Sequence, residues 1–393
     1  MATVTVGSGS QSFNFSGGAG LTIAQQIANL LQAQGTGTTT LSGSGTAPAA
    51  PTTGGNQQLI LAPTVSGAVS VPAGYNVVTN ASTLPGTINA ASGTAILSGN
   101  GGGTFIETGA ATIAASGGSN VILQSGTGLI QLAGGDGNDT ISGAGTGTIA
   151  GGAGNNVIFV NGTGDVVLST GTDTIVLGAG SGSDTVDLRG STRDIVWANN
   201  GASATVIGAG TSETVVGGAG GLTYISAAPG NATIVGGSSQ ATLFGSAGSN
   251  VSFVGASAGG AVFTAGAGNE TLNASTTTSN VAGWASTDPN STTKLIGGSG
   301  VDTLVAGGGF SQLTGNGGND VFVVLAGRGT GIVSITDMTA SADSLIISGY
   351  NAAATRSAIT AAGSGNSVTL SDGTTIVFQN VSVSSISSKI LVG

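Results

Sequence analysis

The chain of 393 residues is acidic, with 16 Asp and Glu against 6 Lys and Arg and a net charge of −10. It contains no cysteine and no histidine, which excludes disulfides, zinc–thiolate sites, thiol nucleophiles and imidazole catalysis. The negative charge argues against nucleic acid as a partner, and no apolar run is long enough to span a bilayer. Glycine contributes 75 residues, yet 39% of the chain is hydrophobic, so glycine is expected to separate short apolar strands rather than to mark disorder.

The first part of the chain differs from the rest. Residues 1–34 are predicted to form a strand and an amphipathic helix, because leucines and isoleucines from Leu21 to Leu31 recur at helical spacing. Residues 35–56 are rich in Gly, Thr, Ser, Ala and Pro, a composition that predicts a linker.

From residue 57 to residue 325 a short apolar pattern returns about every nine residues. Each unit has a large apolar centre, often preceded by threonine and introduced by a turn that contains glycine. Since strand side chains alternate, the centres should point inward and their neighbours outward. The centres are Ile88, Leu97, Ile106, Ile113, Ile122, Ile130, Ile141, Ile149, Ile158, Val166, Ile175, Val186, Val206, Val215, Ile225, Ile234, Leu243, Phe253, Val262, Leu272, Leu295, Leu304, Leu313 and Phe322.

This period predicts an all-β chain, a parallel β-solenoid of the β-roll or β-helix type with half-coils of about nine residues. Two strands and two turns would make one coil, and stacked coils would bury a continuous core. Residues 274–293 interrupt the spacing and are predicted to be an insertion. Residues 326–393 replace the period with longer strand-like runs, which predict a C-terminal β-cap.

Two segments carry a known signature. Residues 134–142 read GGDGNDTIS and residues 297–305 read GGSGVDTLV, and both match the nonapeptide GGxGxDxUx without a mismatch. In these motifs the chain resembles the RTX family, including its surface-layer and matrix-type β-rolls. The resemblance implies Ca²⁺ bound between successive turns. It also implies a secreted, extracellular or cell-surface protein, exported by type I secretion through an uncleaved signal in residues 326–393.

Calcium prefers several oxygen ligands, and a glycine turn supplies carbonyls while its Asp supplies charge. Candidates one coil apart should share an edge of the solenoid, which groups Asp302 with Asp320 and, separately, Asn120, Asp139, Asn156 and Asp173. The alternative is that these side chains hydrogen-bond their own turns. The candidate ligands are Asn120, Asp136, Asp139, Asn156, Asp173, Asp184, Asp302 and Asp320.

The residues that follow the centres should face outward, and many are apolar. Such a stripe predicts a self-association surface. Threonines that precede the centres would form ladders beside it, as β-propensity or ice binding would favour. The predicted surface comprises Leu123, Phe159, Val176, Val216 and Val235.

The sequence therefore favours a non-catalytic, calcium-responsive extracellular protein that self-assembles into a homo-oligomer or filament of a surface layer, fibre or biofilm matrix. One alternative is a monomeric adhesin or ice-binding module, for which a cell-surface polysaccharide is a candidate partner. Another is a β-helical carbohydrate-active enzyme. Its site would be the compact charge cluster Asp184, Asp187, Arg189, Arg193 and Asp194.

Overall fold

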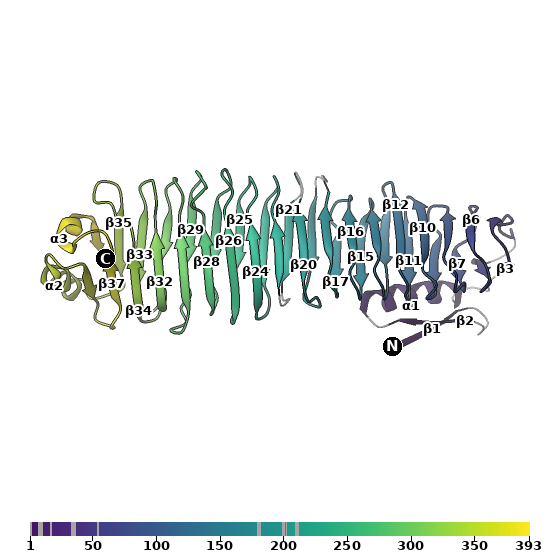
Figure 1. The fold of residues 1–393 in the computed structure, drawn as a ribbon, viewed down its shortest axis with the longest axis horizontal. Coiled ribbons are helices and arrows are strands. Elements are labelled where there is room, and N and C mark those ends of the chain that lie inside the picture. The colour runs from purple at the N-terminus through teal and green to yellow at the C-terminus, as the bar shows by residue number, and fades with distance from the viewer. Residues whose placement is uncertain are drawn as a thin grey trace. The chain divides into compact units, whose positions relative to one another are not determined.

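The computed structural model describes residues 2–6, 11–15, 18–32, 37–52, 55–178, 182–198, 201, 203–208 and 212–393. The fold is an all-β parallel solenoid of about 16 turns with three short helices (Figure 1). The chain divides into two compact units, unit 1 (Met1–Ser203) and unit 2 (Ala204–Gly393), which are described separately.

In unit 1 successive strands alternate between two parallel sheets, here named the odd sheet and the even sheet. The odd sheet contains β3 (Gly37–Leu41), β5 (Gln57–Leu61), β7 (Val77–Asn80), β9 (Ala95–Ser98), β11 (Ala111–Ala115), β13 (Leu129–Ala133), β15 (Thr146–Gly152), β17 (Val166–Ser169) and β19 (Ser183–Asp187). The even sheet contains β4 (Gly45–Thr46), β6 (Gly67–Val71), β8 (Gly86–Ala90), β10 (Gly103–Thr108), β12 (Asn120–Ser125), β14 (Thr140–Gly143), β16 (Val157–Val160), β18 (Thr174–Leu177) and β20 (Asp194–Ala198).

The strands of unit 2 also alternate between an odd sheet and an even sheet. Its odd sheet contains β21 (Ser203–Gly208), β23 (Leu222–Ser226), β25 (Ala241–Phe244), β27 (Ala261–Thr264), β29 (Val281–Trp284), β31 (Thr303–Val305), β33 (Val321–Leu325), β35 (Ser344–Ser348) and β38 (Ile390–Val392). Its even sheet contains β22 (Glu213–Val216), β24 (Gly230–Val235), β26 (Ser249–Val254), β28 (Asn269–Asn273), β30 (Thr292–Ile296), β32 (Gly309–Thr314), β34 (Gly331–Ile335), β36 (Ser367–Thr369) and β37 (Thr375–Phe378).

The core of unit 1 consists of aliphatic rows, in which each coil places the same kind of side chain over the last. In the even sheet Ile122, Ile141, Ile158 and Ile175 are in register and completely buried. The predicted inward direction of these centres is confirmed. Isoleucine suits this position because its branched side chain packs well on a pleated surface.

Five predicted centres are wrong by one residue. Their chain neighbours point inward, as the registers show, because two adjacent large apolar residues leave the alternation ambiguous. The outward-pointing residues are Leu97, Ile106, Val166, Ile225 and Val262, and the inward ones are Ile96, Phe105, Val167, Tyr224 and Phe263.

Two predicted interruptions also prove to be solenoid. Residues 35–56, predicted as a linker, contain β3 and β4, which pair in parallel with β5 and β6. Residues 274–293, predicted as an insertion, contain β29, which pairs with β27 and β31. In β29 the inward position is Gly283, and a Cβ there would lie within 3.2 Å of side-chain carbons of Leu272 and Leu295. The two leucine side chains therefore fill the space at Gly283. For this reason the strand has no large apolar centre that the sequence pattern could reveal.

An N-terminal arm covers part of unit 1. It consists of the antiparallel hairpin β1 (Ala2–Val6) and β2 (Gln11–Phe15), followed by α1 (Gly18–Gln32). The predicted helix is confirmed, and α1 contacts β9, β11, β13 and β15 of the odd sheet (Figure 1). Ile27 of α1 is buried in one cluster with Ala114, Ala133 and Ala150, whose small side chains let the helix approach the sheet closely.

The C-terminal segment of unit 2 is partly solenoid and partly cap. β34, β35, β37 and β38 continue the parallel sheets, and β36 pairs antiparallel with β37. The predicted β-cap also contains the helices α2 (Ala352–Ala362) and α3 (Val383–Ile386). Asn351 caps α2 by accepting a hydrogen bond from the Ala354 amide. Among the described residues, no helix is both long and apolar enough to cross a membrane.

Candidate functional site

Acidic and amide side chains form hydrogen-bonded columns at the starts of the strands. In the even sheet of unit 1 the Oδ1 atoms of Asp139, Asn156, Asp173 and Asp194 each accept the backbone amide of the column residue one coil earlier, at 2.7–3.0 Å. The column begins at Asn120. We call this arrangement a carboxylate ladder, because each rung satisfies an amide that the strand ladder leaves unpaired.

Two further ladders use the odd sheet. In unit 1 the Asp165 amide donates to Asp184 Oδ1 at 2.9 Å. In unit 2 the amides of Val281, Asp302 and Asp320 donate to Oδ1 of Asp302, Asp320 and Asp343 at 2.7, 2.9 and 3.0 Å. The predicted alignment of Asp302 with Asp320 is confirmed, whereas Asp165 and Asp343 were not among the predicted ligands. Asp165 lies one coil before Asp184, and Asp343 lies one coil after Asp320. This spacing could have identified both residues from the sequence.

The second oxygen of each carboxylate distinguishes the rungs. Asp302 Oδ2 accepts the Gly298 amide at 2.6 Å, and Asp173 Oδ2 accepts the Ser169 hydroxyl at 2.7 Å. The corresponding atoms of Asp139 and Asp320 are buried without a hydrogen-bond partner, as are those of Asp165 and Asp194. Burial raises the pKa of all four carboxyls to about 6 against the hydrogen bonds that they accept.

The ladder accounts for the first glycine of the GGxGxDxUx motif. A Cβ at Gly134 would overlap the Asp139 carboxyl group, which folds back over its own turn. Gly297 and Asp302 repeat this relation, as do Gly315 and Asp320. Asp302 also accepts the Gly298 amide of its own turn, which agrees with the alternative that Asp serves the turn itself. The carboxyl groups of Asp139 and Asp320 instead accept amides of the neighbouring coil.

The same geometry bears on calcium. Among the described residues no three acidic or other metal-binding side chains converge on one point. The unpartnered Oδ2 atoms of Asp139 and Asp320 nevertheless have the chemistry of ligands for a hard cation. Asp136 lies in the same turn as Asp139 and is half-buried, and its charge acts on that carboxyl. Asp139 in unit 1 and Asp320 in unit 2 would each hold a separate Ca²⁺ ion with the help of turn carbonyls. Each ion would neutralise the buried charge of its carboxylate.

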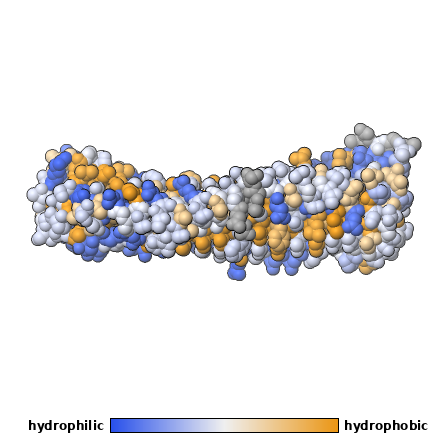
Figure 2. All heavy atoms as spheres, turned by 90° about the horizontal axis from the view of Figure 1, so that it is seen from above, coloured by the Kyte–Doolittle hydropathy of each residue, from blue (hydrophilic) through white to orange (hydrophobic). Residues whose placement is uncertain are grey.

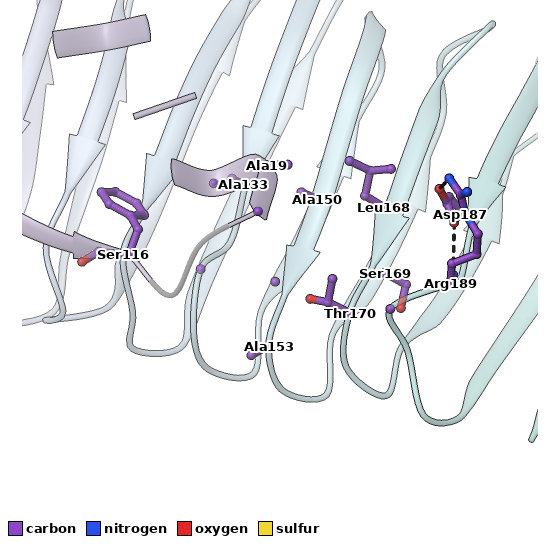
Figure 3. Close-up of a pocket in the computed structure, with 16 residues that line it drawn as sticks. Ala19, Ser116, Ala133, Ala150, Ala153, Leu168, Ser169, Thr170, Asp187 and Arg189 are labelled. Carbon is purple, nitrogen blue, oxygen red and sulfur yellow. Dashed lines mark hydrogen bonds and ion pairs between the residues drawn. The ribbon is translucent and has the colours of Figure 1, made fainter. Parts of the chain in front are cut away.

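A pocket of about 620 Å³ lies between the first turn of α1 and the odd sheet of unit 1 (Figure 3). Ala133, Ala150 and Leu168 line it, and the ion pair between Asp187 and Arg189, at 2.6 Å, stands at one side. The hydrogen bond from Arg189 lowers the pKa of Asp187. Among the described residues that line the pocket, Asp187 is the only acid.

The charge cluster considered for an enzyme is divided by the fold. Asp184 and Asp194 are buried in two different ladders, and Arg193 is exposed. A glycosidase places two carboxyl groups on opposite sides of one bond. Asp187 has no such second carboxyl group within the described lining of the pocket.

The even sheet of unit 1 presents an uncharged apolar face. Two outward rows in register run across strands β10, β12, β14, β16, β18 and β20, and of their twelve positions eight are apolar and four are Thr or Ser. Leu123, Phe159 and Trp197 are 38–43% exposed. We call these twelve positions the even face: Thr104, Ile106, Val121, Leu123, Thr140, Ser142, Val157, Phe159, Thr174, Val176, Ile195 and Trp197.

The predicted self-association residues all point outward. Leu123, Phe159 and Val176 belong to the even face, whereas Val216 and Val235 are half-buried in unit 2 and lie in register with the exposed Val254. Figure 2 shows hydrophobic residues, in orange, reaching the surface on the side drawn. Trp197 was not among the predicted residues, because its place on the even face depends on the pairing of β20 with β18.

These features define the class of the protein as a parallel β-solenoid with buried carboxylate ladders and an exposed apolar sheet face. No family model, curated protein or solved structure matches the chain.

Proposed function

We propose that this chain is a non-catalytic structural protein of the extracellular space or cell surface that self-associates through the even face. The observation that carries the proposal is that this face has no charged side chain and exposes four large apolar ones in unit 1. Contiguous apolar patches of this kind mark interaction sites on soluble proteins.

The net charge of the chain favours a second copy of the same chain as the partner that binds the even face. The chain carries a net charge of −10, so two copies repel each other unless they meet at an uncharged surface. The odd sheet of unit 1 is partly covered by α1, which leaves the even face as an uncovered apolar area. Burying its large side chains would contribute about 1 kcal/mol each, and several copies would add such contacts.

Replacing Leu123 and Phe159 by lysine is expected to abolish association through the even face, because charge would then be desolvated at that contact. Sedimentation velocity and electron microscopy over a concentration series would measure this effect. Thr185→Lys, which places one lysine outward on β19 of the odd sheet, is the control for each of the two substitutions made singly. Monomers of the unsubstituted chain at high concentration would argue against self-association and favour the adhesin or ice-binding alternative.

Export through a C-terminal signal and the extracellular location belong to the same proposal. They rest on the resemblance of GGDGNDTIS and GGSGVDTLV to RTX repeats.

Threonine ladders that would favour ice binding are short. In the odd sheet of unit 2 the row Thr205, Thr223 and Thr242 ends at Val262.

We also propose that Ca²⁺ stabilises particular coils through Asp139 and Asp320. The unpartnered, buried Oδ2 atoms of these two residues support this role. Calcium at about 100 times its dissociation constant would stabilise the folded chain by about 2.7 kcal/mol per site.

Calcium is accordingly expected to raise the thermal midpoint of the unsubstituted chain, measured by circular dichroism. Asp139→Asn and Asp320→Asn should each reduce that increase. Asp372→Asn is the control, because Asp372 is exposed and lies outside the ladders. An equal increase in all variants would show that these ladders do not hold the ion.

A further inference from the structure

The first strand of the odd sheet has an open edge. Among the described residues β3 pairs with one strand, β5. The Gly37 amide donates to the Asn56 carbonyl at 3.1 Å, and the Leu41 carbonyl accepts from the Ala62 amide at 3.0 Å. Because the backbone groups of successive strand residues point to opposite sides, those of Thr38 and Thr40 face away from β5. Such an edge is a template for another strand.

Strand β3 lacks the charged residues and proline that often protect an edge strand. Its sequence, GTTTL, contains no charged residue and no proline, and the side chains of Thr38 and Thr40 are exposed. The final strand of unit 2 differs, since Arg356 of α2 donates to the Val392 carbonyl of β38 at 3.3 Å. Helix α2 also contacts β38. An incoming copy therefore finds an open edge at β3 and a covered one at β38.

We propose that β3 pairs antiparallel with β3 of a second copy, about a two-fold axis through Thr39. In this register Thr38 of each copy stands opposite Thr40 of the other. These are the residues whose amides and carbonyls face the open edge, so each pair exchanges two hydrogen bonds. Threonine pairs directly opposite each other also favour an antiparallel contact.

The side chains agree with this register. The sequence of β3 is nearly palindromic about Thr39, which meets its own counterpart in the second copy. Gly37 stands opposite Leu41, so the one large side chain of the strand meets a residue without a Cβ. Leu41 is only half-buried in a single copy, and the pairing would cover it.

The contact is isologous and closes after two copies. It joins first coils and produces a dimer, whereas the even face supplies contacts of a different kind. The edge pairing is independent of the proposed function, and either can fail alone.

Engineered cysteines would test the register, because the chain has no cysteine of its own. Opposite, non-hydrogen-bonded positions bring Cβ atoms within about 4.5–5.5 Å, close to the separation of a disulfide. The full-length Thr39→Cys variant should form a covalent dimer under mild oxidation. Thr38→Cys, which faces Thr40 rather than its own counterpart, should not. Equal cross-linking of the two variants, or none in Thr39→Cys, would overturn the proposed pairing.

A proline variant provides the second test. Thr40→Pro removes an amide that faces the open edge and leaves the bonds to β5 in place. Sedimentation velocity should show dimerisation weaker by about tenfold or more, since both copies lose a hydrogen bond. Thr40→Ala keeps the amide and should dimerise normally, and circular dichroism would verify folding. Unchanged dimerisation of the proline variant would contradict the proposal. Dimers that persist when Leu123 and Phe159 are lysine would separate this contact from the even face.

Discussion

Replacing Gly152 by alanine is expected to destabilise unit 1 by more than about 3 kcal/mol, because two costs combine at this position. Gly152 has a φ of 87°, a conformation that a residue with a Cβ resists. A Cβ there would also overlap the carbonyl oxygen of Gly135 in the neighbouring coil. The coils cannot separate to relieve this overlap without breaking the hydrogen bonds that stack them. Chemical denaturation followed by circular dichroism would measure the loss.

Substitutions at two other glycines of unit 1 would measure the backbone cost of a positive φ separately from the steric cost of an added Cβ. Gly93 has a φ of 82° with open space around its missing Cβ, so alanine there should cost about 1 kcal/mol. Gly43 has neither a positive φ nor a close neighbour, so alanine there should be nearly neutral. Similar losses in Gly152→Ala and Gly93→Ala would show that contact between coils adds nothing to the backbone cost.

The second large effect concerns Glu107, which is completely buried in β10 with its carboxyl pointing into the solenoid. Neither carboxyl oxygen has a hydrogen-bond partner. Burial raises the pKa of Glu107 from 4.5 to about 9, and the nearby Thr94 amide opposes this only in part. The folded chain thus holds this proton more tightly than the unfolded chain. Glu107 contributes its full stability below pH 4.5 and loses it as the pH rises towards 9.

The free energy of unfolding should therefore fall with pH by an amount that Glu107→Gln removes. Each pH unit in this window corresponds to about 1.4 kcal/mol, so the difference between pH 5 and pH 8 is on the order of 4 kcal/mol. Guanidinium denaturation of both proteins at pH 5, 6.5 and 8 would measure it. The ladder carboxyls titrate in both proteins, so comparing the two isolates Glu107. A variant whose stability differs from that of the unsubstituted chain by the same amount at all three pH values would refute the assignment.

The solenoid could be predicted from the sequence, because its repeat is visible in short stretches of the chain. Ile122, Ile141 and Ile158 recur with threonine or valine before them and turns between them, and any chain with this pattern must stack to bury its apolar side chains. The helix of the N-terminal arm was equally clear from its spacing. The ladder alignment of Asp139 with Asp173 followed from the same period.

Tertiary structure decided the features that depend on what lies in the neighbouring coil. Gly283 carries no apolar signal, and only the leucines that fill its space identify its strand. Leu97 and Phe105 point in opposite directions because of their registers, which two adjacent apolar residues cannot specify. The partnerless oxygen of Asp139, the buried carboxyl of Glu107 and the open edge of β3 likewise depend on contacts made or missing between coils, which no local pattern records.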